Sequence, residues 1–366
     1  MTDPRVTKLA DVLINFALLV QPGEKILINA GLPAEEAALA AYKAVLMAGA
    51  NPTLITSFPR AEELYYKYAT DAQLEFIPPL MKMYEVYDRI LFIYCDQNTR
   101  ALSGIDPRRR TKWLQANNTW FKLMNTREGL GQWCSTMFPS YASAQEANMS
   151  LPDFEDYVFH AGKLDTSDPK AEWKALLTQM HRLVDWLNGH DKISLKGSDV
   201  DLEMSFKGRV FYSTDVKANF PGGEIFTSPV EDTANGWIRV RHGAIMMGQE
   251  VSNIQLWFEN GKVVKETADK GQELLTSILN TDAGARFLGE LAVGTNYSVT
   301  RVSHNMLFDE KMGGTIHIAL GEAFPETGGK NESGLHWDIL CDMWDSEITV
   351  DGELFYRNGK PLGWVD

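Results

Sequence analysis

Residues 25–56 read KILINAGLPAEEAALAAYKAVLMAGANPTLIT, and this stretch decides the fold of the first part of the chain. Lys25–Ala30 is a short apolar run typical of a buried strand, and Asn51–Thr56 is a second one. Between them, Pro33–Ala48 has a proline near its start, acidic residues in its first turn and a glycine after its end, which predicts a helix. Arg89–Tyr94 adds a further strand. Strands that alternate with helices in this way indicate a largely parallel sheet covered on both faces.

The pattern changes after about residue 150, where the composition shifts and a long helix is predicted from about Ala171 to Asn188. From Ile193 onward, apolar and polar residues alternate and turn signals recur, which is typical of strands and hairpins. One interruption, Lys265 to Asn280, has the pattern of a helix. We therefore expect an α/β N-terminal domain, residues 1–165, with a mostly parallel sheet and flanking helices. An α+β C-terminal domain, residues 166–366, should carry the chemistry.

Composition and charge exclude several classes of protein. The 366 residues carry a formal net charge of −14, which argues against a nucleic-acid binder that relies on a general positive field. No glycine-rich phosphate-binding motif follows any predicted strand, so the layout gives no reason to expect a nucleotide. The charged N-terminal stretch does not resemble a signal peptide, and no run approaches the length of a membrane span. Three widely spaced cysteines form no metal pair or disulfide framework, and a cytoplasmic protein is expected.

The stretch Leu307–Met343 holds the clearest chemical signal. His317, His336 and Asp338 lie in apolar, strand-like runs, and the last two form an H-x-D pair. In an extended chain, side chains two residues apart point to the same face, so this imidazole and carboxylate converge. Burying such groups costs several kcal/mol unless something compensates. A divalent cation such as zinc, cobalt, manganese or iron would compensate, and a hydrogen-bonded His–Asp pair is the alternative.

Two more segments in the second half have the character of site loops. Glu224 stands in PGGEIFTSPVEDTANG, residues 221–236, and Glu290 stands in FLGELAVGTN, residues 287–296. An acid in such apolar surroundings is unusual, and a metal ion would explain it. The alternatives are a surface hairpin with an acidic side chain for Glu224 and a helix-capping acid for Glu290.

Four motifs in order carry a resemblance to a known family. They are E-I-F-T-S-P from Glu224, L-G-E-x-x-x-G-T-N from Leu288, L-F-D-E-K-x-G-G-T-x-H-x-A-L-G from Leu307 and G-G-x-N-x-S-x-x-H-x-D from Gly328. Together they resemble the AmpS/AmpT-type thermophilic aminopeptidases, which are dinuclear metallopeptidases. The resemblance runs along the whole length, since the opening QPGEKILI is also similar to that family's N-terminal domain.

The resemblance implies a site, a reaction and an assembly. It implies two divalent metal ions per chain (Zn, Co, Mn or Mg), a peptide or amide substrate with a free N-terminus, and a homodimer, with no nucleic acid or membrane as partner. Glu290 would be the catalytic residue, either bridging two ions or accepting the proton of the attacking water. Glu310 would be a weaker ligand or a contact to the substrate amine. The positions that match metal ligands are Glu224, Glu290, Glu310, His317, His336 and Asp338.

One departure from the family concerns Phe324. The family commonly has a tyrosine seven residues after the first histidine ligand, where its hydroxyl would stabilise the oxyanion of the transition state. Tyr297 is a candidate substitute. The scaffold also resembles the Fe(II)-dependent 2,5-dihydroxypyridine ring-cleaving dioxygenases, which hold one iron with two histidines and an aspartate. In those enzymes a histidine matches Glu290 and the first glutamate is lost, so the retained Glu224 and Glu290 favour hydrolysis.

Overall fold

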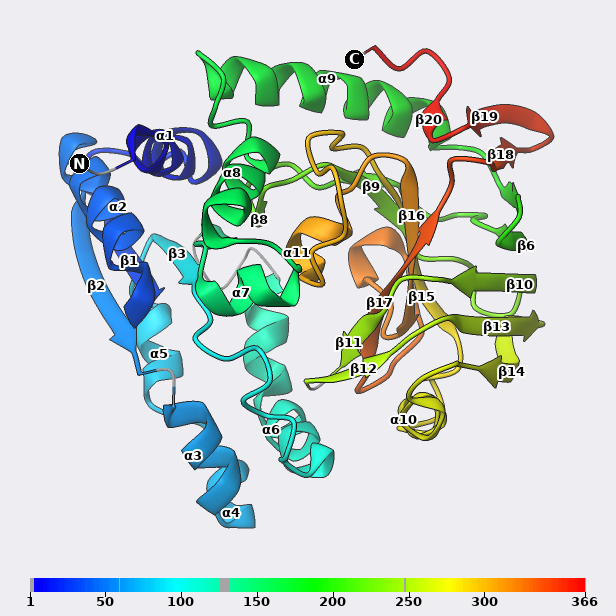
Figure 1. Cartoon of the computed structure of the whole chain (residues 1–366), viewed down its shortest axis with the longest axis horizontal. Coiled ribbons are helices and arrows are strands. Elements are labelled where there is room, and N and C mark those ends of the chain that lie inside the picture. Colours follow the sequence, from blue (N-terminus) through cyan, green and yellow to red (C-terminus); the bar gives the residue numbers. More distant parts are fainter. Residues whose placement is uncertain (1–2, 59, 126–131, 247, 366) are drawn as a thin grey trace. The chain divides into compact units, whose positions relative to one another are not determined.

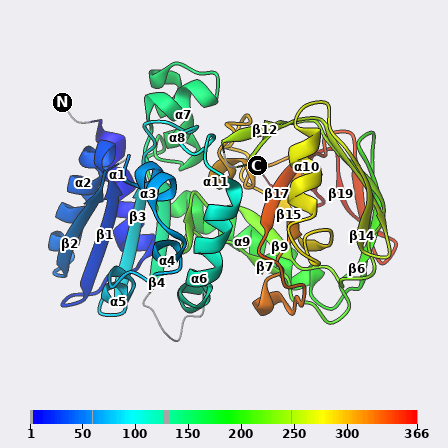
Figure 2. The same cartoon turned by 90° about the horizontal axis from the view of Figure 1, so that it is seen from below.

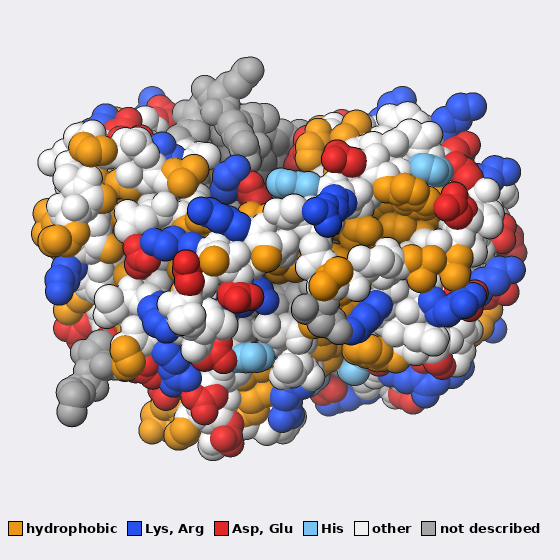
Figure 3. Space-filling model, turned by 90° about the horizontal axis from the view of Figure 1, so that it is seen from above, with side chains coloured by type: hydrophobic (Ala, Val, Ile, Leu, Met, Phe, Trp, Pro, Cys, Tyr) orange, Lys and Arg blue, Asp and Glu red, His pale blue; other side chains and the backbone are white. Residues whose placement is uncertain are grey.

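The structure is a computed structural model that describes residues 3–58, 60–125, 132–246 and 248–365. The chain forms two compact units. The first unit comprises Met1–Trp173 and Asp215–Gly222, and the second comprises Lys174–Thr214 and Gly223–Asp366. Within the described residues, no helix combines the length and the apolar character that crossing a bilayer requires. On the face drawn in Figure 3, Lys and Arg side chains are interspersed with Asp and Glu side chains.

The first unit is built on a parallel sheet. Among its described residues this sheet has five strands in the order β2-β1-β3-β4-β8, and each neighbouring pair runs parallel. Ile26, Leu27 and Ile28 are fully buried in its second strand, as expected of an apolar strand covered on both faces. Figure 1 shows β2, β1 and β3 side by side, and Figure 2 also shows β4 next to β3. Their bounds are β1 Lys25–Gly31, β2 Asn51–Ser57, β3 Arg89–Tyr94, β4 Gln132–Met137 and β8 Asn219–Phe220.

Helices connect these strands, which confirms the predicted α/β class. The helix predicted over Pro33–Ala48 is present as α2, Glu35–Met47, and Gly49 follows it with a φ of +75°, a conformation that glycine adopts without strain. Pro33 lies in the short 3₁₀ turn Leu32–Ala34 just before it. The other helices are α1 Pro4–Val12 with the π-helical Leu13–Ala17, α3 Ala61–Tyr68, α4 Asp71–Leu74, α5 Leu80–Tyr84, α6 Pro107–Asn125, α7 Tyr141–Glu146 and α8 Leu151–Ala161. Helix α9, Pro169–Leu187, runs on into the second unit.

The second unit contains a large antiparallel sheet. Over the described part of the chain its strand order is β14-β13-β10-β6-β5-β18-β19-β20, and β11 and β12 form a separate ribbon. Helix α10, Gln272–Leu279, follows β14. The strands are β5 Lys192–Lys196, β6 Val200–Ser205, β10 Asn235–Val240, β11 Ala244–Met246, β12 Gln249–Val251, β13 Ile254–Glu259, β14 Lys262–Thr267, β18 Glu347–Val350, β19 Glu353–Arg357 and β20 Lys360–Pro361.

A second antiparallel sheet in this unit carries the candidate site. Its described strands follow the order β17-β16-β15-β9-β7. Strands β15 and β16 are buried at every position, so they form the centre of the sheet and of this unit's core. The bounds are β7 Tyr212–Ser213, β9 Glu224–Thr227, β15 Leu288–Gly294, β16 Thr315–Gly321 and β17 His336–Asp342, and the short helix α11, Met306–Asp309, precedes β16.

One predicted element was partly wrong. The helix expected over Lys265–Asn280 starts only at Gln272, and Lys265–Thr267 belong to β14. The reason is a tertiary one, since the Asn260-Gly261 turn brings β14 back along β13 and the backbone hydrogen bonds of this edge strand go to its neighbour. The α+β class of the second unit is otherwise confirmed.

Candidate metal centre

The register of the five-stranded sheet places five of the predicted ligands on one face. Neighbours that are paired across an antiparallel ladder point to the same side, as do residues two apart along a strand. Asp338 pairs with Ala319, which also pairs with Glu290, and Ala319 lies two residues after His317. The strands that supply the five ligands are β9 with Glu224, β15 with Glu290, β16 with His317, and β17 with His336 and Asp338.

Small residues stand opposite these ligands and leave space for them. His317 is paired with Ala292, and Glu224 is paired with Gly294. His336 is paired with Gly321, whose φ is +100° and whose backbone lies close to the Leu335 carbonyl. The polar side chains therefore gather above alanine and glycine positions, whereas Trp337 points to the opposite, apolar face and is buried.

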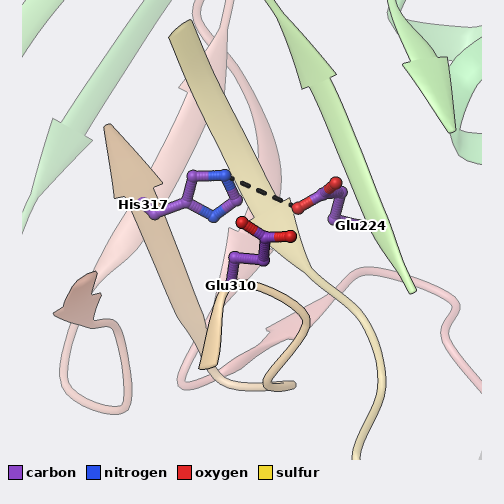
Figure 4. A group of neighbouring side chains, drawn as sticks. All are labelled: Glu224, Glu310 and His317. Carbon is purple, nitrogen blue, oxygen red and sulfur yellow. Dashed lines mark ion pairs between the residues drawn. The ribbon is translucent and has the colours of Figure 1, made fainter. Parts of the chain in front are cut away.

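Glu310 reaches the same place from a different element. It follows α11 directly as the helix's C-terminal cap residue. Figure 4 shows its carboxylate, that of Glu224 and the His317 ring pointing toward one another. These three residues each offer a ligand atom, and the atoms lie within 4.8 Å of one another. Glu290, His317 and Asp338 form a second such group.

The nitrogen atoms of the two histidines face the carboxylates. The Nε2 atom of His317 lies 3.5 Å from Glu224 Oε2 and 3.6 Å from Glu290 Oε1. The Nε2 atom of His336 lies 3.4 Å from Glu290 Oε2 and 3.4 Å from Asp338 Oδ1. The two oxygens of Glu290 thus face two different histidines.

Unpaired atoms at the site fit a cation. Glu224 Oε2, Asp338 Oδ1 and His317 Nδ1 are buried and make no hydrogen bond within the described structure. Leaving buried carboxylate oxygens unpaired is costly, and a divalent ion at this point would satisfy both of them. The donor set of carboxylate oxygens and imidazole nitrogens suits zinc, cobalt or manganese.

The orientation of His336 is set by the backbone. Its Nδ1 atom lies 2.8 Å from the Glu322 carbonyl oxygen, an acceptor that requires the proton on Nδ1 and leaves the Nε2 lone pair to the site. The loop between β16 and β17 is itself anchored, because Asn331 Nδ2 donates to the carbonyls of Gly321 at 2.6 Å and Gly284 at 2.9 Å. This arrangement is the support that metal-binding histidines usually have.

The electrostatics show an excess of negative charge. Burial opposes protonation of His317, but Glu290, Glu224 and Asp338 raise its pKa to about 9. Burial likewise opposes ionisation of Glu290, but the two histidines lower its pKa to about 2. In Glu310, burial together with the nearby Glu224 and Asp338 raises the pKa to about 7, against the opposing effect of Lys311. The carboxylates therefore draw positive charge to this face, either as protons on the histidines or as cations.

Lys311 is part of the cluster although the sequence patterns did not single it out. Its side chain is fully buried, and its Nζ atom donates to Glu224 Oε1 and Glu310 Oε1, each at 2.5 Å. Burial opposes its charge, but these two carboxylates raise the pKa of Lys311 above its usual range. The available signal was that Lys311 directly follows two acidic residues, Asp309 and Glu310, within one of the quoted motifs. A lysine is rarely buried without a partner.

Phe324 lies beside the histidine end of the site. Its ring centroid is 5.0 Å from that of His336 and 5.4 Å from that of Phe226, which follows Glu224 on the same face of β9. The ring of Tyr212 extends this row of aromatic side chains, with its centroid 6.1 Å from that of Phe226. Tyr297 was the candidate substitute for the family tyrosine. Its hydroxyl instead donates a hydrogen bond to the Gly359 carbonyl at 2.7 Å.

Comparisons with known proteins agree with this geometry. The chain is 28% identical to aminopeptidase 2 of Geobacillus stearothermophilus, with 98% of each chain covered, and 30% identical to aminopeptidase T of Thermus aquaticus, with 72% of each covered. Its fold matches the structure of wild-type AmpT from Thermus thermophilus with a TM-score of 0.85 at 23% identity, over 98% of this chain and 99% of that one.

The match to a family extends over nearly the whole chain. Residues 2–360 fit the pattern of the family described as thermophilic metalloprotease (M29). This span covers nearly all of both units and all six predicted ligands, so the predicted resemblance to metallo-aminopeptidases is confirmed. The chain belongs to the M29 family of thermophilic metalloproteases.

Proposed function

We propose that this protein is an aminopeptidase that removes N-terminal residues from peptides by hydrolysis, using two divalent ions held by the six predicted ligands. One observation carries the proposal. Two groups of ligand atoms, Glu224–Glu310–His317 and Glu290–His317–Asp338, overlap at His317 on a single sheet face. Because His336 also faces Glu290 and Asp338, each of two neighbouring positions has at least three protein donors.

The geometry supports a bridging role for Glu290. One of its oxygens faces His317 and the other faces His336, as expected of a carboxylate shared between two ions. Its pKa of about 2 keeps it ionised at neutral pH, which suits cation binding better than proton transfer. Glu310 would be the weaker ligand in the group with Glu224 and His317, since Lys311 already donates a hydrogen bond to one of its oxygens.

The chemistry follows from general properties of two-ion hydrolases. Bound divalent ions lower the pKa of a shared water and polarise the scissile carbonyl. In this protein His336 and Asp338 would hold one side of the site, and Glu224 and His317 the other. The free α-amine of the substrate would occupy an open position there, which restricts cleavage to the N-terminal residue. Phe324 offers no hydroxyl for the oxyanion, a charge that bound divalent ions would help to stabilise.

The ring-cleaving dioxygenase is not supported. Neither the family match nor the aminopeptidase relatives favour it. A single facial-triad iron needs two histidines and one carboxylate, whereas Glu224 and Glu310 here create a further group of donors around His317.

Several finer statements belong to the same proposal. We propose zinc, cobalt, manganese or magnesium as the ion, a homodimer as the assembly and the cytoplasm as the location. The C-terminal domain, predicted as residues 166–366, would be the catalytic domain, since all six ligands lie in it. Its substrate would be a peptide or amide with a free N-terminus.

The test combines metal content with turnover. The purified protein is stripped of metal, reloaded with zinc, cobalt or manganese, and assayed for metal per chain and for release of aniline from leucine- and phenylalanine-anilides. An N-acetylated copy of each substrate is the matched control. About two ions per chain and cleavage of the free-amine substrates alone are expected. One ion per chain, or equal cleavage of the blocked substrate, would contradict the proposal.

A further inference from the structure

A lysine ammonium does not bind a metal ion, yet that of Lys311 lies among the proposed metal ligands. Its side chain is completely buried, and its ammonium contacts the same two glutamates that face His317. Its backbone is also fixed, since the Asn296 N–H donates to the Lys311 carbonyl at 2.8 Å. A buried ammonium repels a nearby cation, so its position has consequences for metal binding.

Lys311 donates a hydrogen bond to one carboxylate oxygen of Glu224 and to one of Glu310. Oε1 of Glu224 and Oε1 of Glu310 both accept a hydrogen bond from Nζ. The other oxygen of Glu224, Oε2, faces His317 at 3.5 Å and has no hydrogen-bond partner. Each of these glutamates would therefore offer a cation one oxygen that the ammonium does not contact.

The second position lacks such a neighbour. Over the described ranges, no hydrogen bond or ion pair joins Lys311 to Glu290, His336 or Asp338. There the carboxylates of Glu290 and Asp338 would face a cation without the Lys311 ammonium beside them. At the position of Glu224, Glu310 and His317, by contrast, an ammonium contacts two of the proposed ligands.

We propose that Lys311 is a positioning residue that makes the two cation positions unequal, so that the position of Glu224, Glu310 and His317 binds its ion more weakly than the position of Glu290, His336 and Asp338. The inference rests on the proposed two-ion function. It predicts an ordered filling of the site, with the lysine-flanked ion as the one that exchanges.

The first experiment uses the unaltered protein. Crystals of metal-stripped protein are loaded with one equivalent of zinc per chain, and an anomalous difference map locates the ion. A peak between Glu290, His336 and Asp338 is the expected result. A peak between Glu224, Glu310 and His317 would overturn the inference while leaving the proposed function intact. Absence of any peak at either position, even with excess zinc, would defeat both.

The second experiment measures the two affinities by calorimetric titration of metal-stripped protein with zinc. Lys311→Met removes the ammonium and keeps much of the side-chain length, and Lys262→Met, on the exposed start of β14 in the other large sheet, is the matched control. The wild type and Lys262→Met should show two unequal steps. In Lys311→Met the weaker step should gain affinity by about tenfold or more, because a positive charge beside a dication has been removed. An unchanged or wider gap between the steps would overturn the inference, and if Lys311→Met does not fold, the anomalous map decides alone.

Discussion

At the scale of single residues, the centre depends on polar groups that are buried almost completely. Glu224, Glu290 and His317 are each at most 5% exposed, and Asp338 points an oxygen into the site without a hydrogen bond. Such groups are stable in a protein interior only when opposite charges or ions compensate them. Substitutions here should therefore change both metal binding and turnover. Variants of Glu290 and Glu310 can distinguish a carboxylate shared between two ions from one that binds a single ion.

Glu290→Gln tests the bridging role. The amide keeps the shape but cannot offer two anionic oxygens, so bound metal should fall below two per chain and kcat/KM should drop by about 10³-fold or more. The paired variant Glu310→Gln should lose at most the ion next to Glu224 and His317, because Glu290, His336 and Asp338 still hold the other. Metal analysis with steady-state kinetics checks both. Full metal content in Glu290→Gln would contradict the bridging assignment.

Phe324→Tyr tests the departure from the family. The Phe324 ring lies beside His336, with the two ring centroids 5.0 Å apart, so this substitution would add a hydroxyl to a side chain at the edge of the site. An oxyanion donor in the right place contributes about 10²–10³ in kcat, so a rise in kcat of about tenfold with little change in KM is expected. Tyr297→Phe is the control and should leave kcat unchanged, because that hydroxyl is bonded to Gly359. A fall in kcat in Phe324→Tyr would show that the phenylalanine has a role of its own.

At the scale of elements, the sheet register explains why the site forms. A shift of one residue in β17 would move His336 and Asp338 to the face now occupied by Trp337. The register is held by the fully buried strands β15 and β16 and, at the end of β17, by an ion pair. There His242, in the loop between β10 and β11, places Nε2 2.9 Å from Asp342 Oδ2.

The His242–Asp342 pair predicts a pH dependence of stability. The hydrogen bond to Asp342 raises the pKa of His242 above 6.5, against the effect of burial and with help from Asp309. A histidine whose pKa is higher in the folded protein than in the unfolded protein stabilises the folded state. This stabilisation is complete at pH values below the histidine pKa of the unfolded protein, and it is lost as the pH rises through the histidine pKa of the folded protein. His242→Asn should therefore lower stability at pH 6 by about 0.5–1 kcal/mol, since the pair is one-third exposed, and by less at pH 9.

Thermal unfolding at both pH values is the measurement, and Asp342→Asn should remove the same pH dependence. An equal destabilisation of His242→Asn at pH 6 and pH 9 would mean that the contact is one of packing and not of charge.

At the scale of the whole molecule, the second unit contains all six proposed ligands, and they come from five separate elements. Ions bound at their meeting point would link strands β9, β15, β16 and β17 with the end of α11. Metal binding should therefore contribute to the stability of this unit, because a ligand that binds only the folded state shifts the unfolding equilibrium.

Removal of the ions with a chelator should lower the melting temperature. Metal at about 100 times its Kd stabilises by about 2.7 kcal/mol, which corresponds to roughly 5–10 °C for a unit of this size. Differential scanning calorimetry with and without chelator, followed by zinc re-addition, measures the shift. The Glu290→Gln variant should show a smaller shift than the wild type. An unchanged melting temperature of the wild type would mean that no ion links these elements.

The sequence alone determined the class of each unit, the strands and helices with strong periodicity, and which residues are proposed for the site. Local patterns carry this information, because α2 has its own start and stop signals and each ligand stands in a recognisable short motif. Only the tertiary structure decided that Lys265–Thr267 form an edge strand, that Tyr297 donates to Gly359, and that Lys311 is buried between two glutamates. These outcomes depend on partners far away in the chain, since 87 residues separate Lys311 from Glu224, and no local pattern shows which distant groups will meet.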